Sequence, residues 1–217
     1  MSHFKRAIRR KLTSIEVGLG SLYNSNVEFQ TFVRYLWALS LLPETDICDA
    51  WEDFISSKYD ILKDSLDDED AVDAIDSFLE YFEKTWVGSL NWRTKQRRNP
   101  MFAYSMWNKY NSVLTDDPLT SNSAEGYNSA LSASLPVNCG IWTLIQQLRT
   151  EESMNMKKLR DVLSGLQNNL ATNPTSSRNL GRKQRHTDLK AIVSNYNNVS
   201  LDMYMNAIID FYNFSRQ

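Results

Sequence analysis

Glycine and proline are scarce in this 217-residue chain, with seven and five residues respectively. All-β sandwiches and barrels need many tight turns, so this scarcity argues for helices instead.

Cysteine and histidine are scarcer still, with two residues each. Cys48 and Cys139 have no CxxC spacing, which indicates free thiols rather than a disulfide scaffold. Neither His3 nor His186 has a cysteine or carboxylate at the spacing of metal ligands.

Several motifs of catalysis and of membrane insertion are also absent. The sequence has no glycine-rich phosphate loop, no GxSxG elbow and no HExxH helix. Its N-terminus is basic and then amphipathic, without the apolar core of a signal peptide. The longest apolar stretch, around Ala38 to Leu42, is too short to span a bilayer. We therefore expect an intracellular protein that does not enter a membrane.

Apolar and aromatic residues are abundant, at 42% and 12% of the chain. This is enough to bury one sizeable core or two small helical subdomains, which excludes disorder throughout.

The net charge of −2 hides an asymmetry. Residues 1–85 carry nine Lys/Arg and seventeen Asp/Glu, a balance of −8, whereas residues 86–217 carry fifteen and nine, a balance of +6. A surplus of this size is typical of a soluble surface and also of a face that binds nucleic acid.

Apolar residues recur with helical spacing along most of the chain, which predicts an all-α fold. Phe4, Ile8, Leu12 and Ile15 share one face of a helix expected over 2–17, with five Lys/Arg on its other sides. Further helices are expected over 27–41, around 47–55, over 67–84, over 101–113, from Asn122, over 141–170 as one long helix or a kinked pair, and over 188–217 as a helical pair. Residues 86–100 and 172–187 lack a helical period, and we expect an irregular connection and a basic flexible loop there.

An acidic run, Asp67 to Asp70, stands where one of these helices should begin. Negative charge at that end opposes the positive end of the helix dipole and stabilises the helix. The run lacks the central Gly and terminal Glu of a calcium-binding loop. It therefore indicates a solvated helix start rather than a metal site.

One short segment, Thr120-Ser121-Asn122-Ser123-Ala124-Glu125-Gly126-Tyr127-Asn128, carries two interpretations. Its spacing alone indicates a capping box, in which the Asn122 side chain caps a helix and Glu125 reaches back to the cap amide. The segment also resembles the (T/S)NNxxEG(W/Y)(N/H) signature of Mutator-like (MULE) transposases. Ser121 departs from that signature, because it replaces one of the paired asparagines.

Other stretches resemble the same family in the same order along the chain. They are residues 4–10, 18–19, Tyr23, 38–43, 78–88, 107–110, 140–145, Leu148, Glu151 and Glu152. The likeness covers nearly the whole chain. It implies that residues 1–119 are a helical insertion region, that 120–171 hold the helix with the third catalytic-type Glu and the helices after it, and that the loop 172–187 precedes a C-terminal pair over 188–217.

In that family an RNase H-like domain binds two Mg²⁺ or Mn²⁺ ions through two Asp and one Glu, and the metals activate the nucleophile and stabilise the leaving oxygen. Glu125 matches the third carboxylate and is the candidate catalytic residue and metal ligand. The two Asp and the central sheet would lie before Met1, and His3 matches only the histidine of the family's CxxH pattern. The resemblance thus implies a nuclear C-terminal remnant of an RNase H-like catalytic domain, without its central sheet and without a cofactor or activity of its own.

Four cations lie within six residues, after Trp92: Arg93, Lys95, Arg97 and Arg98. Such a cluster neutralises phosphates, and Trp92 is placed to stack on an exposed base, which predicts weak, salt-sensitive DNA binding without sequence preference. A solvated basic loop that pairs with the acidic helix start near Asp67 explains the same residues equally well.

Two other functions remain open from the sequence. The chain could be a domesticated helical module that binds protein partners and has no role with nucleic acid. A nuclease whose two Asp come from another chain is the third interpretation. Helices that pack on a sheet in the intact family would expose apolar surface here, so we also expect self-association.

Overall fold

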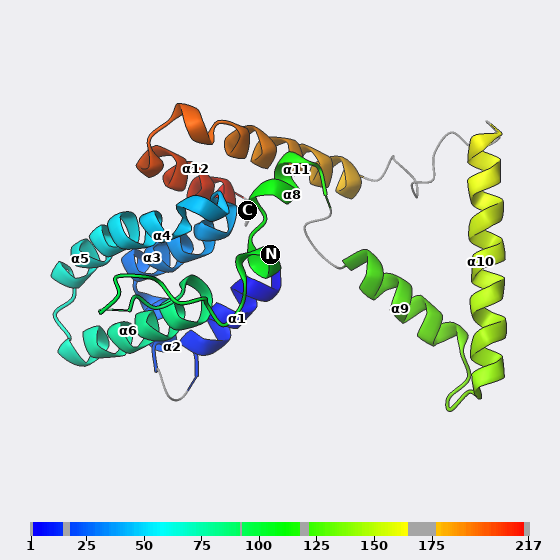
Figure 1. Ribbon diagram of the computed structural model, residues 1–217, viewed down its shortest axis with the longest axis horizontal. Helices are drawn as coiled ribbons and strands as arrows, with labels where there is room; N and C mark the ends of the chain where they lie inside the picture. The colour runs from blue at the N-terminus through cyan, green and yellow to red at the C-terminus, as the bar shows by residue number, and fades with distance from the viewer. Residues whose placement is uncertain (1, 15–17, 92, 118–121, 165–176, 215–217) are drawn as a thin grey trace. The chain divides into compact units, whose positions relative to one another are not determined.

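The computed structural model describes residues 2–14, 18–91, 93–117, 122–164 and 177–214 (Figure 1). Within these ranges the regular structure is helical, and the only β pairing is an isolated bridge between Leu90 and Arg97. The prediction of an all-α fold is confirmed. None of the helices in the described ranges is both long enough and apolar enough to cross a membrane.

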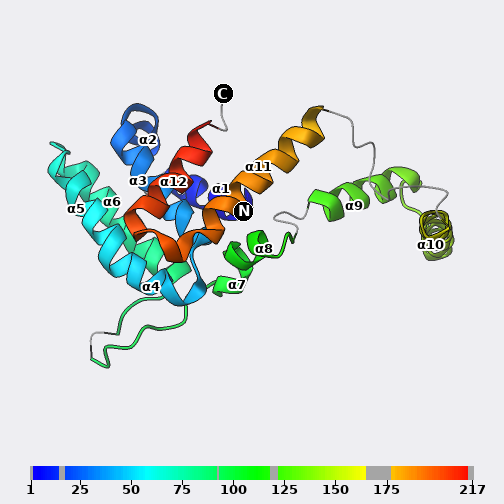
Figure 2. The same cartoon turned by 90° about the horizontal axis from the view of Figure 1, so that it is seen from above.

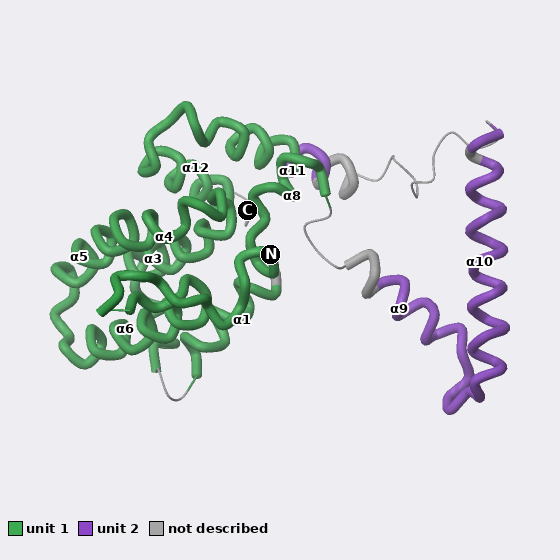
Figure 3. Tube along the Cα trace, in the orientation of Figure 1, with its two compact units in different colours: residues 1–119, 186–217 green, residues 120–185 purple. Residues whose placement is uncertain are grey.

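The chain divides into two compact units (Figure 3): unit 1 comprises residues 1–119 and 186–217, and unit 2 comprises residues 120–185. Unit 1 holds the helices α1 (Ser2–Leu12), α2 (Gly20–Ser25), α3 (Val27–Ala38), α4 (Ile47–Asp49), α5 (Ser56–Asp64), α6 (Glu69–Phe82), α7 (Tyr104–Trp107), α8 (Tyr110–Leu114) and α12 (Leu201–Phe214). It also holds the 3-10 turns η1 (Leu39–Leu41), η2 (Glu44–Asp46) and η5 (Tyr196–Asn198), and the π-helical segments η3 (Ala50–Ile55) and η4 (Glu83–Val87). Unit 2 holds α9 (Asn122–Ser134) and α10 (Ile141–Leu163), and α11 (Ser177–Ser194) begins in unit 2 and ends in unit 1.

Helix α3 is the centre of unit 1, where it packs against α2, α5 and α12 (Figures 1 and 2). More than half of its residues are buried: Phe29, Phe32, Val33, Tyr35, Leu36, Trp37 and Ala38. The helix begins where Asn26 accepts a hydrogen bond from the Phe29 amide at 2.8 Å. Continued by η1, it ends before Pro43, as predicted, because proline has no amide donor to extend it.

Helix α1 packs on α6 through the face predicted for it. Phe4, Ile8 and Leu12 are 3%, 0% and 0% exposed, and Ile15 lies outside the described residues. The helix ends at Leu12, so the predicted bound at 17 is wrong. The hydroxyl of Thr13 donates to the Arg9 carbonyl at 3.0 Å, and such bonds compete with the helical pattern at this end.

The basic sides of α1 are only partly open to solvent. Lys5 Nζ lies 3.2 Å from the ring centroid of Tyr212 in α12, and Lys11 Nζ lies 5.0 Å from that of Tyr81 in α6. The Arg9 guanidinium lies 5.9 Å from the Tyr23 ring in α2. Three of the five cations therefore contact aromatic rings of the same unit, at a separation where cation–π attraction operates.

Helix α12 and the turn before it complete the core of unit 1. Tyr35 donates to Asn206 Oδ1 at 2.6 Å, and Lys58 Nζ donates to Asp202 Oδ1 at 2.7 Å. The hydroxyl of Tyr204, which is 1% exposed, donates to the Leu41 carbonyl. These bonds hold the C-terminal helix against α3, η1 and α5, which precede it by most of the chain.

The helix predicted over 101–113 is wrong, because two short helices, α7 and α8, occupy part of that range. Between them Asn108 has an extended backbone, with ψ at 141°. Its Nδ2 donates to the Leu42 carbonyl at 2.7 Å, and the next amide, of Lys109, donates to the Ser40 carbonyl at 2.7 Å. Tertiary bonds to η1 and to Leu42 directly after it thus replace the helical ones.

The loop expected over 172–187 is also contradicted from Ser177 onward, where α11 begins. The described side chains at 181 and 183–185 are exposed, and the first buried one is Leu189. An apolar stripe reports packing rather than helix formation itself, so a solvated helix rich in Lys, Arg and Gln shows none.

Unit 2 has a different character, because none of its described side chains is buried. Helix α9 begins at Asn122, where the sequence predicts a start, and α10 is a single helix as far as Leu163. The two meet at the connection over 135–140 and then diverge (Figure 1). Large apolar side chains on α10 remain in solvent, among them Ile141 at 64% and Leu163 at 78% exposure.

Candidate nucleic-acid interface

The predicted DNA contact lies on a hairpin loop over residues 88–98, which leaves η4 and projects from unit 1 (Figure 2). Ser89 accepts a hydrogen bond from the Arg98 amide at 2.9 Å, and the Asn91 amide donates to Gln96 at 2.9 Å. The Asn91 side chain accepts from the amides of Arg93 and Thr94 at 3.0 and 3.4 Å. The loop is therefore ordered by its own backbone, although its sequence has no period.

The loop closes at Gly88, where the two arms approach closely. Gly88 has φ at 98°, a conformation that side chains disfavour. A Cβ atom there would lie 2.0 Å from the carbonyl oxygen of Arg98. Only glycine fits at this position for both reasons.

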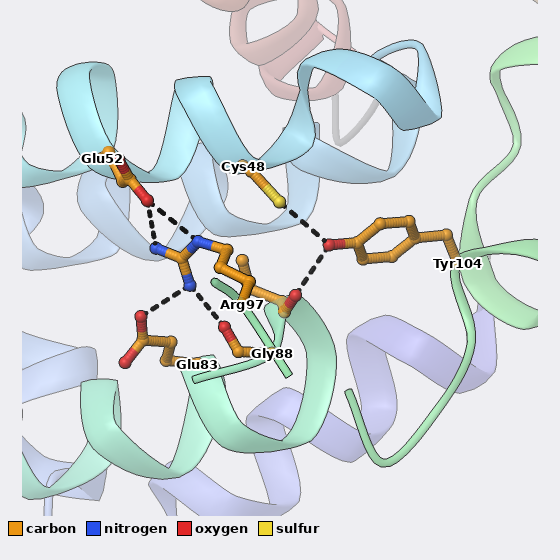
Figure 4. A network of polar contacts seen from close by, with 7 residues as sticks. Cys48, Glu52, Glu83, Gly88, Arg97 and Tyr104 are labelled. Atoms are coloured by element: carbon orange, nitrogen blue, oxygen red, sulfur yellow. Dashed lines mark hydrogen bonds and ion pairs between the residues drawn. The ribbon is translucent and has the colours of Figure 1, made fainter. Parts of the chain in front are cut away.

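Arg97 anchors the loop to the body of unit 1 (Figure 4). Its Nε donates to Glu52 Oε1 at 2.9 Å, and its Nη1 donates to Glu83 Oε1 at 2.7 Å and to the Gly88 carbonyl. Burial alone would lower the pKa of this guanidinium, but the hydrogen bonds to Glu83 and Glu52 outweigh it and raise the pKa above its usual value. The side chain is 14% exposed and already bound to two carboxylates, which leaves it unsuited to a phosphate contact.

Both carboxylates come from π-helical segments, since Glu52 lies within η3 and Glu83 begins η4. A π-helical turn widens the helix by one residue and changes the direction of its side chains, and such turns are frequent at specialised sites. Here the two turns present their acids to a single cation. Neither acid belongs to the run near Asp67, which the sequence offered as a partner for this loop.

A second contact beside Arg97 joins α4, η4 and α7 (Figure 4). The Tyr104 hydroxyl donates to the Val87 carbonyl at 2.6 Å and lies 3.2 Å from the thiol of Cys48. Burial, together with the nearby Cys48 thiol, raises the pKa of Tyr104 above its usual value. Cys48 and Cys139 are both free, as predicted.

The other three cations of the predicted contact, Arg93, Lys95 and Arg98, have exposed side chains on the same loop. Lys95 adopts φ at 54°, which turns the chain at the end of the loop. Trp92, the predicted stacking residue, lies outside the described residues. The loop therefore presents three cations to solvent and uses the fourth for its own attachment. No local feature of the sequence separates Arg97 from its neighbours, because Glu52 is 45 positions away.

The predicted metal ligand, Glu125, lies on α9, and its side chain is outside the described part of the structure, as are Thr120 and Ser121. Among the described side chains, no three His, Cys, Asp or Glu gather closely enough to hold a metal ion. Asp116 binds Lys190 Nζ at 2.5 Å, with His186 Nδ1 at 3.6 Å, a surface ion pair that joins α11 to the end of α8.

Comparison of the chain with protein-family models, with curated proteins and with solved structures found no match.

Proposed function

We propose that this chain is the helical part of a MULE-type DNA transposase, which acts in the nucleus and does not cut DNA by itself. The observation that carries the proposal is the signature-like segment over 120–128, with Glu125 as its carboxylate, at the start of α9. The described residues before that segment are mainly helical, and this is the place of the helical insertion in the family. The order of the other similar stretches supports the same assignment.

Cleavage of a phosphodiester bond by two metal ions needs carboxylates that converge from separate elements. Within these residues only Glu125 matches the family's three metal carboxylates, so we propose no independent nuclease activity. In the intact family Mg²⁺ or Mn²⁺ would occupy the complete site. The test is incubation of the purified chain with supercoiled and linear duplex DNA and either metal. Metal-dependent cleavage that is lost in Glu125→Gln would refute this part of the proposal.

The contribution of the chain to transposition is, in this proposal, a weak electrostatic contact with the DNA backbone. The exposed Arg93, Lys95 and Arg98 lie within six residues on a loop whose base is fixed by Arg97 and Gly88. Cations on an ordered loop neutralise neighbouring phosphates and release counterions, so the affinity falls steeply as salt rises. Base edges are not read by such a contact, which makes it indifferent to sequence.

Fluorescence anisotropy with labelled duplex and single-stranded DNA, at several salt concentrations, tests this contact. The informative variant is Arg93→Ala/Lys95→Ala/Arg98→Ala, because it removes the exposed cations and keeps Arg97 in place. We expect it to lose most of the binding and to lower the slope of log affinity against log salt by about two to three. The matched control is Arg6→Ala/Arg10→Ala/Lys63→Ala, which removes the same charge from exposed positions on α1 and α5. Equal loss in both variants, or no binding by the wild type at low salt, would contradict a contact at this loop.

A domesticated helical module that binds proteins is the second candidate, and the exposed apolar side chains of α10 favour it. It predicts that the chain does not bind DNA even at low salt. The same anisotropy series therefore separates the two functions.

A further inference from the structure

Helix α10 carries a strip of exposed large apolar side chains along one side. Along it Leu148, Met156, Leu159 and Leu163 are 42%, 44%, 39% and 78% exposed. The end of α9 lies near the first turns of α10, and the two helices diverge from there (Figure 1). Exposed large apolar side chains that recur along one side of a soluble helix mark an interaction surface.

Positions on this side of α10 recur with a seven-residue repeat, the spacing at which two helices pair along a seam. Leu148, Glu152, Asn155 and Leu159 lie at intervals of four, three and four, and so form one line along the helix. The two ends of this line are apolar and its middle is polar. The order of apolar and polar positions in this line is therefore the same in both directions.

This symmetry decides how a second copy of α10 would dock. In a parallel pair each residue faces its own equivalent, so the two Glu152 carboxylates would meet and repel each other. In an antiparallel pair Leu148 faces Leu159 of the second copy, and Glu152 faces Asn155 of the second copy, whose amide can donate to a carboxylate. Only the antiparallel arrangement sets apolar against apolar and donor against acceptor.

The charges beside the strip agree with the same arrangement. Glu151 and Lys158 flank the line on one side, seven residues apart. In antiparallel pairs the residues of one flank face the same flank of the other helix, so Glu151 meets Lys158 of the second copy, twice per pair. Glu151 Oε1 accepts a bond from Gln147 at 3.3 Å, and a carboxylate has capacity for a further donor. On the other flank, Arg149 would face the thioether of Met156 of the second copy.

We propose that α10 is a homodimerisation helix that pairs antiparallel with α10 of a second copy, centred between Glu152 and Asn155. The central polar layer fixes the register and weakens the pair, as buried polar layers do in coiled coils. The dimer is therefore reversible. It would present the exposed cations of two chains on one particle. The proposal is independent of the assignment to a transposase.

Sedimentation equilibrium of the full chain, at protein concentrations spanning about a hundredfold, tests the pairing. We expect a reversible monomer–dimer equilibrium in the wild type. Leu148→Asp/Leu159→Asp should stay monomeric at every concentration. Both side chains are exposed in the single chain and lie in unit 2, so the substitutions leave the fold of unit 1 unchanged. A wild type that stays monomeric, or a double variant that dimerises as well as the wild type, overturns the proposal.

A charge exchange tests the direction of the pair. Glu151→Lys and Lys158→Glu should each weaken the dimer about tenfold, because each turns two attractions into two repulsions. The combination Glu151→Lys/Lys158→Glu should bring the dissociation constant back to within about threefold of the wild type. Lys157→Glu makes the same charge change as Lys158→Glu but on the opposite side of α10, and it should leave the dissociation constant of the dimer unchanged. A combined variant no better than the single ones overturns the antiparallel arrangement.

Discussion

Arg97 Nη1 lies 2.7 Å from Glu83 Oε1, although 14 positions separate the two residues. The same guanidinium reaches Glu52 from its other edge. One cation thus joins the loop over 88–98 to two π-helical turns of unit 1. It stabilises the position of the cations beside it, although it does not itself face solvent.

Arg97→Ala should destabilise unit 1 by about 2 kcal/mol, because it leaves two carboxylates close together without their shared donor. Glu52 is half exposed, which keeps the loss below that of a fully buried pair. Urea unfolding followed by circular dichroism measures the difference. Arg98→Ala removes an equal charge one position along and should change the free energy of unfolding by less than about 0.5 kcal/mol. Equal effects of the two substitutions would count against the anchoring role of Arg97.

Gly88→Ala should cost about 3 kcal/mol or more, since the new methyl group would overlap the Arg98 carbonyl and φ at 98° is unfavourable for alanine. The loop would open and Arg97 would lose its carbonyl partner. Thermal unfolding is the measurement. Gly126→Ala in α9 is the matched control, because no atom lies within 4 Å of the added Cβ and alanine favours a helix. A loss of stability in the control similar to that in Gly88→Ala would argue against the close approach.

Asn108→Ala should cost about 2 kcal/mol, because the buried Leu42 carbonyl loses its donor and the Tyr110 amide loses its acceptor. The change acts where the junction between α7 and α8 bonds to the residue after η1. Chemical unfolding gives the magnitude, and Asn111→Ala on the exposed side of α8 is the control. An unchanged midpoint for Asn108→Ala would mean that the backbone bond from Lys109 to Ser40 suffices to hold this junction.

Unit 1 should lose stability above about pH 10, where unfolded tyrosines ionise. Burial is the first cause that raises the pKa of six tyrosines above the ordinary value of 10.0: Tyr35, Tyr59, Tyr104, Tyr110, Tyr196 and Tyr204. A raised pKa in the folded state means that the unfolded state releases its protons first, so rising pH favours unfolding. The stabilisation is fully present below pH 10 and is lost as the pH rises toward the pKa values of the folded state.

Urea midpoints between pH 8 and about pH 11.5 test this dependence. We expect a plateau to about pH 9 and a steady fall above pH 10. Tyr196→Phe should flatten part of the fall while lowering the plateau, because it also removes the bond to Asp46. A midpoint that stays constant to pH 11 would contradict the assigned shifts.

Helical periodicity predicted most of the elements of unit 1, because those helices bury one side. The face of α1 through Phe4, Ile8 and Leu12 follows directly from spacing. Periodicity failed for residues 177–187, where a helix is solvated, and for 101–113, where Asn108 bonds to a distant carbonyl. Both failures have the same origin, since neither solvation of a helix nor a tertiary hydrogen bond changes the spacing of apolar residues along the sequence.

The candidate site was predictable only in part. Four clustered cations mark the loop, but the sequence does not show that Arg97 faces inward, because its partners come from two other segments. The glycine requirement at Gly88 is equally hidden, since it depends on a carbonyl ten residues later. The role of Glu125 rests on resemblance to the transposase signature.

The bond between Tyr35 and Asn206 spans 171 positions. Synthesis runs from the N-terminus, so the side of α3 that α12 covers has no partner until the residues of α12, 171 positions later, have left the ribosome. The nascent polypeptide therefore carries an uncovered apolar helix while the residues between α3 and α12 are made, when aggregation and chaperone capture compete with folding. The yield of this protein in a cell should depend more on holdase chaperones than its folded stability would suggest.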